Sequence, residues 1–270
     1  MAGIKILVIF EHGLCIRTFS DAYFGLIAIF KTTYMKPTIY LILLLVAFSC
    51  ANNSSQKNSV FIDVSKDVLT PRNYIIPKAE KPLNIDGLAD EAAWDGAEFS
   101  QAFIDIEGDK TPTYETRMKM LWDDDFLYVF GKMEEPHVWG NLRQRDTIIF
   151  YNNDFEVFID PDGSTYTYGE IEINVLNTVW DLLLDKPYRL GGIPVFHWNL
   201  DELKSAIHID GTLNNPNDID EGWSIEIAIP MKALVELKGQ RSSLPEEGEQ
   251  WKMGFSRVNW QFDVKDGKYD

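Results

Sequence analysis

The sequence predicts an all-β fold, an antiparallel β-sandwich with short helical turns. In the C-terminal part of the chain, apolar residues recur with a period of two rather than 3.6, and no long helical pattern is present. Five segments alternate in this way and are bounded by turn-forming Asp, Asn, Pro and Gly residues: 126–133, 153–160, 170–175, 223–229 and 251–260. Strands with one apolar face each are typical of two sheets packed face to face.

The strand predicted at 223–229 shows this alternation most clearly. One face of this strand carries the apolar residues Trp223, Ile225, Ile227 and Ile229. The other face carries Ser224, Glu226 and Ala228. Pro230 ends the strand, and a short helix containing Ala233 and Leu234 follows. We expect an immunoglobulin-like or jelly-roll-like arrangement of such strands.

The first fifty residues predict targeting signals rather than a folded unit. A basic start at Met35-Lys36 precedes an apolar run from Ile39 to Phe48 that is too short to span a bilayer comfortably. The run ends in Ser49-Cys50, which resembles a bacterial lipoprotein signal (35–50) with Cys50 as the lipidated residue. Residues 1–34 are apolar but interrupted by charges, which suggests an upstream start codon assigned by mistake; an authentic signal or membrane segment is the alternative.

Lipidation of Cys50 leaves the folded part without a thiol, because the other cysteine, Cys15, lies in the leader. Residues 51–81 begin as a polar stretch and are predicted to form a flexible tether, and 82–270 the β-sandwich. These segments predict a lipid-anchored protein of the bacterial cell envelope, periplasmic or on the outer-membrane surface. Its membrane contact is then made through lipid only.

Charge narrows the choice of partners. The first fifty residues hold four of the 25 basic and two of the 42 acidic residues, so residues 51–270 carry 21 basic and 40 acidic residues, a net charge of −19. Such a field repels nucleic acids and disfavours anionic polysaccharides. Neutral glycans and cations such as calcium remain as partners, and all eight tryptophans lie in this part of the chain.

Polar side chains gather on one face of two predicted strands. They are Asp154 and Glu156 on the first strand and Glu170, Glu172 and Asn174 on the second. If the two strands pair across the connection at 161–163, four carboxylates and one amide share a sheet face. Like charges at this distance are destabilising, so an arginine, a cation or the hydroxyls of a sugar should compensate them, unless the face lies in water.

Two acidic turns are candidate calcium sites, at Asp123 and Asp125 and at Asp160 and Asp162. Each offers several carboxylate oxygens, the ligands that calcium prefers. Neither stretch has the twelve-residue loop of an EF-hand, and aspartate also occurs in turns for backbone reasons alone.

Residues 85–94 read Ile-Asp-Gly-Leu-Ala-Asp-Glu-Ala-Ala-Trp, which predicts a tight turn at Asp86-Gly87 and then one helical turn that buries Trp94 in the core. With 121–129, Leu-Trp-Asp-Asp-Asp-Phe-Leu-Tyr-Val, this stretch resembles the opening of the family-nine carbohydrate-binding modules, which are non-catalytic β-sandwiches. Similar stretches follow over nearly all of 82–260: 145–146, 153–160, 168–174, 180–181, 222–230 and 254–259.

The resemblance implies that two aromatic rings clamp a terminal sugar while charged and amide groups bind its hydroxyls. Trp139 and Trp180 are the expected clamp, with Trp198 and Trp260 in reserve. The expected hydroxyl partners are Arg145, Asp154, Glu156, Glu172 and Asn174. Family members often carry structural calcium, and xylan or cellulose fragments are their usual ligands, so the resemblance implies a role in carbohydrate catabolism at the envelope.

Three alternatives stay open. Glu156 and Glu172 could act as a glycosidase acid and base at a suitable separation. Nucleophile, Walker and zinc motifs are missing, so an accessory role beside a glycoside hydrolase is favoured over catalysis.

The second alternative is a haem-binding DOMON-like electron-transfer domain, which needs a methionine and a histidine as haem ligands. Methionine is far commoner in a core than as a haem ligand. The available residues are Met118, Met120, Met133, Met253, His137 and His197. A scaffold that contacts only proteins is the third.

Related sequences usually continue past the Arg257-x-Asn259 segment, whereas this chain stops at Asp270. The resemblance therefore implies either a truncated C-terminus or a branch without the last strand, and truncation leaves a sheet edge unpaired.

Overall fold

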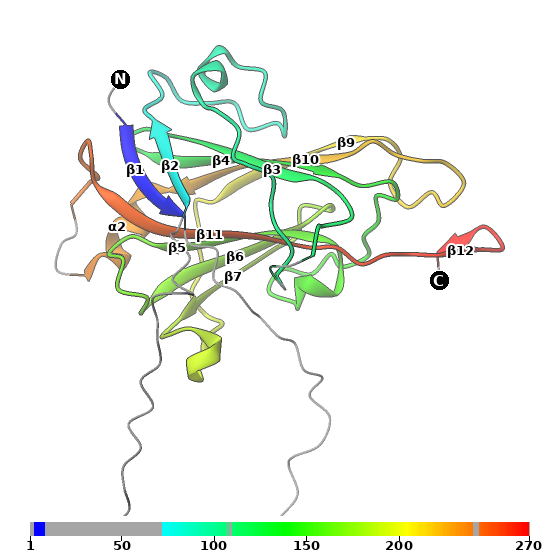
Figure 1. Cartoon of the computed structure of the whole chain (residues 1–270). Coiled ribbons are helices and arrows are strands. Elements are labelled where there is room, and N and C mark those ends of the chain that lie inside the picture. The colour runs from blue at the N-terminus through cyan, green and yellow to red at the C-terminus, as the bar shows by residue number, and fades with distance from the viewer. Residues whose placement is uncertain (1–2, 9–71, 107, 109, 240–242, 270) are drawn as a thin grey trace, which may run out of the picture. The chain divides into compact units, whose positions relative to one another are not determined.

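The computed structural model describes residues 3–8, 72–106, 108, 110–239 and 243–269 (Figure 1). Two sheets form a sandwich, with strand orders β2-β1-β11-β5-β6-β7-β8 in sheet A and β3-β4-β10-β9 in sheet B. All strand pairs are antiparallel except β1 with β11, which is parallel. The predicted all-β sandwich with short helical turns is confirmed.

The strands of sheet A are β1 (Gly3–Val8), β2 (Arg72–Pro77), β5 (Asp154–Asp160), β6 (Tyr168–Asn174), β7 (Val179–Leu184), β8 (Pro194–Val195) and β11 (Gln250–Val258). Those of sheet B are β3 (Thr116–Trp122), β4 (Phe126–Glu134), β9 (Lys204–Asp210) and β10 (Gly222–Pro230). The remaining elements are the hairpin strands β12 (Val264–Lys265) and β13 (Lys268–Tyr269), the 3-10 turns η1 (Ala92–Gly96), η2 (Ile149–Tyr151) and η3 (Tyr188–Leu190), and helix α2 (Met231–Leu237). All five predicted strands are therefore present, and the short helix follows Pro230 as expected.

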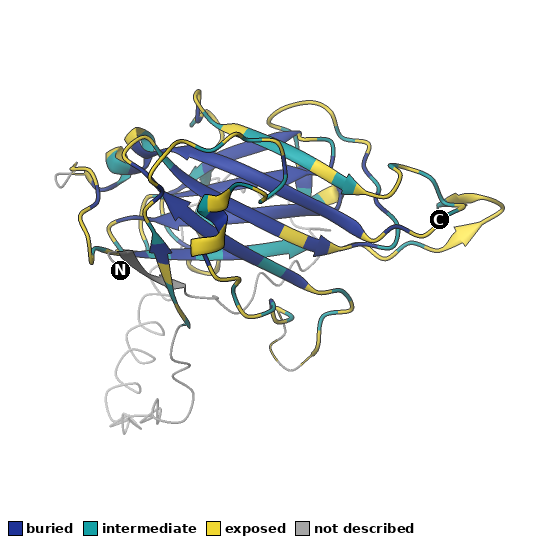
Figure 2. Cartoon of the chain, turned by 90° about the horizontal axis from the view of Figure 1, so that it is seen from above, coloured by how far each residue is buried: buried dark blue, intermediate teal, exposed yellow. Residues whose placement is uncertain are grey.

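The core lies between the sheets. Apolar residues of β5 (Phe155, Val157, Ile159) and of β10 (Ile225, Ile227, Ile229) belong to the same buried cluster. Figure 2 shows buried strands at the centre of the molecule and exposed residues mainly in the loops. Gly131 on β4 allows the closest approach, because a Cβ there would lie 2.8 Å from the ring of Phe155.

The folded domain begins before the expected boundary at residue 82. Arg72–Pro77, which the sequence assigns to the tether, forms β2 at the end of sheet A. Ile76 is fully buried, and the hydroxyl of Tyr74 donates to Glu98 O at 2.5 Å and accepts from Met120 N at 3.1 Å. These contacts with residues distant in the sequence hold β2 in the sheet, although the residues flanking it in the sequence are mostly polar.

The segment 85–94 is attached to sheet B by one buried carboxylate. Glu226 of β10 accepts hydrogen bonds from Asp86 N (2.9 Å), Gly87 N (3.3 Å) and Trp94 Nε1 (3.1 Å). Trp94 is 1 % exposed and packs in a second apolar cluster on the outer side of this sheet, so the prediction that it is a core residue is confirmed. Burial raises the pKa of Glu226 to about 7, because the carboxylate is withdrawn from water.

Within the described part of the chain, no helix has the length and apolar character needed to cross a membrane. Cys50 and the predicted signal peptide (35–50) lie outside the described residues, as do 9–34 and most of the predicted tether.

Candidate functional site: the outer face of sheet A

The polar residues predicted to gather on one sheet face do so. In the register of β5 with β6, Glu156 lies opposite Glu172 and Asp154 lies opposite Asn174. Ser256 of β11 and Trp180 of β7 extend the first of these pairs into one row across the sheet. Because the alternate residues of β5 point into the core, this row lies on the outer face of sheet A.

The carboxylates on this face are buried. We call Asp154, Glu156, Glu170 and Glu172 the acid cluster; none of the four is more than 9 % exposed. Burial, reinforced by the neighbouring charge of Glu156, raises the pKa of Glu170 to about 8 and that of Glu172 to about 11. For the same two causes the pKa of Asp154 is raised well above its ordinary value, and burial also raises the pKa of Glu156.

Hydrogen bonds satisfy only part of the acid cluster. Glu156 accepts from the hydroxyl of Ser256, and Glu170 accepts from the hydroxyl of Tyr188 at 2.9 Å. Asp154 Oδ1 accepts from Val258 N at 3.2 Å. The second oxygen of Asp154 and Oε2 of Glu172 are buried without a hydrogen-bond partner. Among the described residues, no lysine or arginine forms an ion pair with any member of the cluster.

Asn174 is occupied by the turn that follows β6. Its Oδ1 accepts from Leu176 N and Thr178 N, both at 3.0 Å, and its Nδ2 donates to Leu142 O at 2.8 Å. The side chain is fully buried, so its observed role is to hold the turn and the loop before η2.

Trp180 lies at one end of the row, inside an aromatic layer. Its ring stacks on Phe196 with centroids 5.8 Å apart and planes at 11°, and Phe150 lies 6.2 Å away. Trp180 is 7 % exposed with an unpartnered Nε1, whereas Phe196 is 55 % exposed. Phe196 therefore presents to solvent the aromatic surface that the sequence assigned to Trp180.

Trp139 is half-buried and packs against Phe262 at a centroid distance of 5.1 Å. Of the reserve tryptophans, Trp260 is the exposed one, at 49 %. Its backbone N donates to Asn153 Oδ1 at 2.7 Å, and its Nε1 donates to the backbone O of Phe150 in η2 at 2.9 Å. The family resemblance favoured Trp139 and Trp180 and did not include Phe196, which lies in an irregular loop without a diagnostic pattern.

Arg145 is paired with another acid rather than with the cluster. Its Nη2 lies 2.5 Å from Oδ1 of Asp181, which is fully buried and also accepts from Leu200 N at 2.5 Å. Burial raises the pKa of Asp181, and the Leu200 N–H and the Arg145 guanidinium oppose that shift.

Replacing Arg145 by methionine should lower the free energy of unfolding by about 1–3 kcal/mol, because Asp181 Oδ1 then lacks its charged partner. The neighbouring Arg143→Met variant, at an exposed position, should match the parent protein. Chemical denaturation monitored by tryptophan fluorescence measures both; equal stability of the two variants would show that the ion pair is unimportant.

The two predicted calcium turns are held by their own hydrogen bonds. Asp123 Oδ1 accepts from Asp125 N (2.8 Å) and Phe126 N (2.7 Å), and its Oδ2 accepts from the hydroxyl of Tyr128 (2.7 Å). These contacts fit an Asx turn, and Asp125 itself is exposed. Calcium at this turn stays a prediction, but the contacts that define the turn need no ion.

In the hairpin, Asp160 Oδ2 accepts from Thr165 N (2.7 Å) and Asp162 Oδ1 from Ser164 N (2.8 Å). Asp160 Oδ1 is buried without a partner, and burial raises the pKa of this residue to about 6. This orphaned oxygen fits a cation, although no group of three close potential ligands includes Asp160 in the part of the chain that the structure describes.

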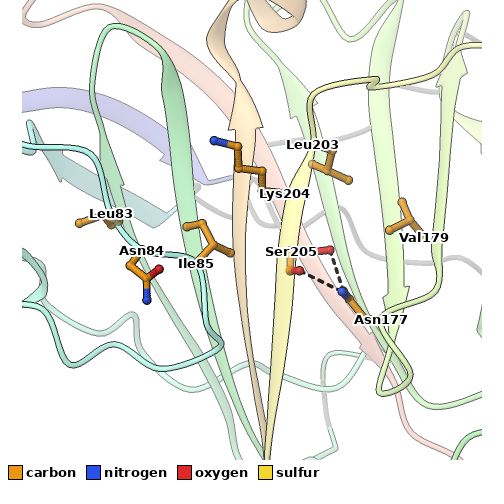
Figure 3. Close-up of a pocket in the computed structure, with 8 residues that line it drawn as sticks. All are labelled: Leu83, Asn84, Ile85, Asn177, Val179, Leu203, Lys204 and Ser205. Atoms are coloured by element: carbon orange, nitrogen blue, oxygen red, sulfur yellow. Dashed lines mark hydrogen bonds between the residues drawn. The ribbon is translucent and has the colours of Figure 1, made fainter.

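Two surface grooves in the described part of the chain lie elsewhere. One, of about 610 Å³, runs along β9 between Leu83–Ile85 and the β6–β7 turn (Figure 3). In it, Asn177 Nδ2 donates to Ser205 O at 2.9 Å, and Ser205 Oγ donates to Asn177 Oδ1 at 2.6 Å. The other, of about 320 Å³, has Glu135, His137 and Trp260 among its lining residues. Neither is lined by the acid cluster.

The four methionines considered for haem ligation, Met118, Met120, Met133 and Met253, all lie in the main core, which is the ordinary place for methionine.

Comparison with known proteins agrees with the expected family. Residues 85–181 match a family model described as carbohydrate family 9 binding domain-like. None of the curated proteins matches this chain.

Three solved structures are similar to the chain. A family 9 carbohydrate-binding module from Caldicellulosiruptor kristjanssonii in complex with cellotriose is 17% identical, with 57% of this chain and 66% of that chain covered and a TM-score of 0.39. A module from the same organism in complex with glucose is also 17% identical, with 67% and 74% covered and a TM-score of 0.42. A protein from Bacteroides uniformis ATCC 8492 described as carbohydrate-binding is 14% identical, with 67% and 96% covered and a TM-score of 0.46.

This chain thus spans just under two thirds of the first of these modules. Residues 85–181 carry a carbohydrate family 9 binding domain-like region, which confirms the expected family resemblance over that part of the chain.

Proposed function

We propose that this domain binds neutral oligosaccharides without transforming them, in support of glycan catabolism at the bacterial cell envelope. The observation that carries the proposal is the family match over 85–181, a range that contains all seven residues expected to contact sugar. They are Trp139, Trp180, Arg145, Asp154, Glu156, Glu172 and Asn174.

The aromatic layer on the outer face of sheet A is the part suited to a sugar. A pyranose has an apolar face of C–H groups that stacks on aromatic rings. Phe196 and Trp260 are about half exposed, and Trp180 supports Phe196 from beneath. Arg145 is partly exposed and is proposed to bind hydroxyls, whereas the buried acid cluster and Asn174 hold the sheet and loops below.

Charge and the similar structures suggest the ligand. A net charge of −17 disfavours acidic glycans, and the similar modules hold cellotriose and glucose. We therefore propose a neutral oligosaccharide of the cellulose or xylan type.

Catalysis by Glu156 and Glu172 is disfavoured by their surroundings. One carboxylate oxygen of each side chain lies within 4.8 Å of the other. Both are at least nine-tenths buried, so a sugar ring has no room between them. An accessory role beside a glycoside hydrolase is consistent with this arrangement.

Retention of the full chain on cellulose- and xylan-type oligosaccharides tests the proposal. Trp139→Ala and Trp180→Ala, and more cleanly the exposed Phe196→Ala, should each weaken binding at least about tenfold, because a stacking surface is lost. Tyr166→Ala is the matched control, since Tyr166 is equally exposed but lies in the hairpin at the other end of β5 and β6. If all three variants bind as the parent does, the assigned surface is wrong.

Lipid attachment at Cys50 and calcium at the two acidic turns belong to the same proposal. Cys50→Ala should release the protein from the membrane fraction of the expressing cell. An absorption spectrum separates the haem alternative, because only a haem protein shows a Soret band.

A further inference from the structure

We propose that Asp154, Glu156 and Glu172 bind one divalent cation of the calcium type on the outer face of sheet A. One carboxylate oxygen from each of the three residues lies within 4.8 Å of the others. In the described part of the chain, no other group of three potential metal ligands is this close. The proposed site is distinct from both acidic turns.

Unpartnered oxygens point to an occupant. Asp154 is fully buried and Glu172 is 2 % exposed, yet Oδ2 of the first and Oε2 of the second have no hydrogen-bond partner. A buried charged acceptor without a partner is costly. No cationic side chain of the described residues forms an ion pair here, and a bound cation would satisfy both oxygens as well as the charge of Glu156.

The ligand chemistry selects the ion. Three carboxylates and no sulfur or imidazole favour a hard cation over zinc or copper. Calcium binds oxygen at about 2.3–2.6 Å, so oxygens on opposite sides of it lie up to about 5 Å apart, against about 4.2 Å for magnesium. An upper limit of 4.8 Å on these separations is compatible with calcium.

Protons are the competing occupant. The fourth carboxylate, Glu170, already accepts a hydrogen bond from Tyr188, and Glu156 accepts one from Ser256. The negative charge that these neutral donors do not remove would be neutralised by protons or by a cation. The two occupants predict opposite effects of an amide substitution. With protons, Glu172→Gln imitates the occupied state, whereas with calcium it removes a ligand.

Calcium titration of the full chain after chelator treatment tests the site at about pH 8. Calcium at about a hundredfold excess over its Kd should raise Tm by roughly 5–10 °C. Terbium should bind in place of calcium and show luminescence excited through the indole of Trp180, which lies directly opposite Glu172. Magnesium should be the weaker ligand.

Asp154→Asn and Glu172→Gln should abolish the Tm response and the terbium signal, and their near-identical shapes keep the fold. The double variant Asp160→Asn with Asp162→Asn is the matched control, and it should keep both responses. Trp180→Phe should lose the luminescence but keep the calcium-dependent Tm. A parent protein without either response, a response that survives both cluster variants, or one lost in the hairpin variant alone would overturn the proposal. Saccharide binding is measured separately, so failure of one proposal does not imply failure of the other.

Discussion

Replacing Glu226 by alanine is expected to lower the free energy of unfolding by about 3–4 kcal/mol. The substitution leaves three donors, Asp86 N, Gly87 N and Trp94 Nε1, without their acceptor. It also removes a carboxylate from the vicinity of the buried Lys119, whose ammonium lies 5.2 Å from the ring centre of Trp94. Equilibrium denaturation measures the loss.

Two further variants separate the contribution of Glu226 from general damage to β10. Glu226→Gln keeps one acceptor oxygen and should lose only about half as much stability. Ser224→Ala removes the hydroxyl that donates to Gly87 O, a single neutral bond, and should cost about 1 kcal/mol. If Glu226→Ala is no more harmful than Ser224→Ala, the carboxylate does not hold the 85–94 segment in place.

In the presence of chelator, the domain should lose stability as the pH rises from about 5 to about 9. Burial raises the pKa of Glu170 to about 8 and that of Glu172 to about 11, above the ordinary value of 4.5. A carboxyl group with a raised pKa takes up a proton on folding, so its favourable contribution is complete below the ordinary pKa and is lost as the pH rises through the folded value. Several such groups act in the same direction, and Asp154 and Glu156 add to them.

Glu172→Gln removes the carboxyl group whose pKa is raised to about 11 and with it a large part of this pH-dependent stability. Without divalent cations it should raise the free energy of unfolding at about pH 8 by about 2–5 kcal/mol and flatten the pH dependence. Glu247→Gln, at an exposed position, should leave the curve unchanged. Thermal denaturation across the pH range measures both. A parent protein that becomes more stable with rising pH in chelator would contradict the prediction.

The alternation of β5 and β6 was sufficient to predict the acid cluster. Because side chains in a strand alternate between faces, pairing of the two strands across a short hairpin brings Glu156 opposite Glu172 without further information. Likewise, the alternation in β10 predicted its two faces, including the outward position of Glu226.

Partners supplied by loops and distant elements could not be predicted in this way. The pairing of Arg145 with Asp181, the stacking of Phe196 on Trp180 and the hydroxyl of Tyr188 on Glu170 depend on the conformation of irregular segments. Strand β2 was missed for a related reason, since only a short apolar stretch within polar surroundings marks it, and its order comes from contacts with distant residues such as Met120.

Strand β9 is an edge strand of sheet B, and the side-chain amide of Asn177 donates a hydrogen bond to the backbone carbonyl of Ser205 on this strand. A strand of another molecule that approached this edge would need that carbonyl for its own ladder. The amide cap therefore protects the domain against edge-to-edge aggregation, which would matter for a protein that the proposed lipid anchor concentrates on a membrane surface.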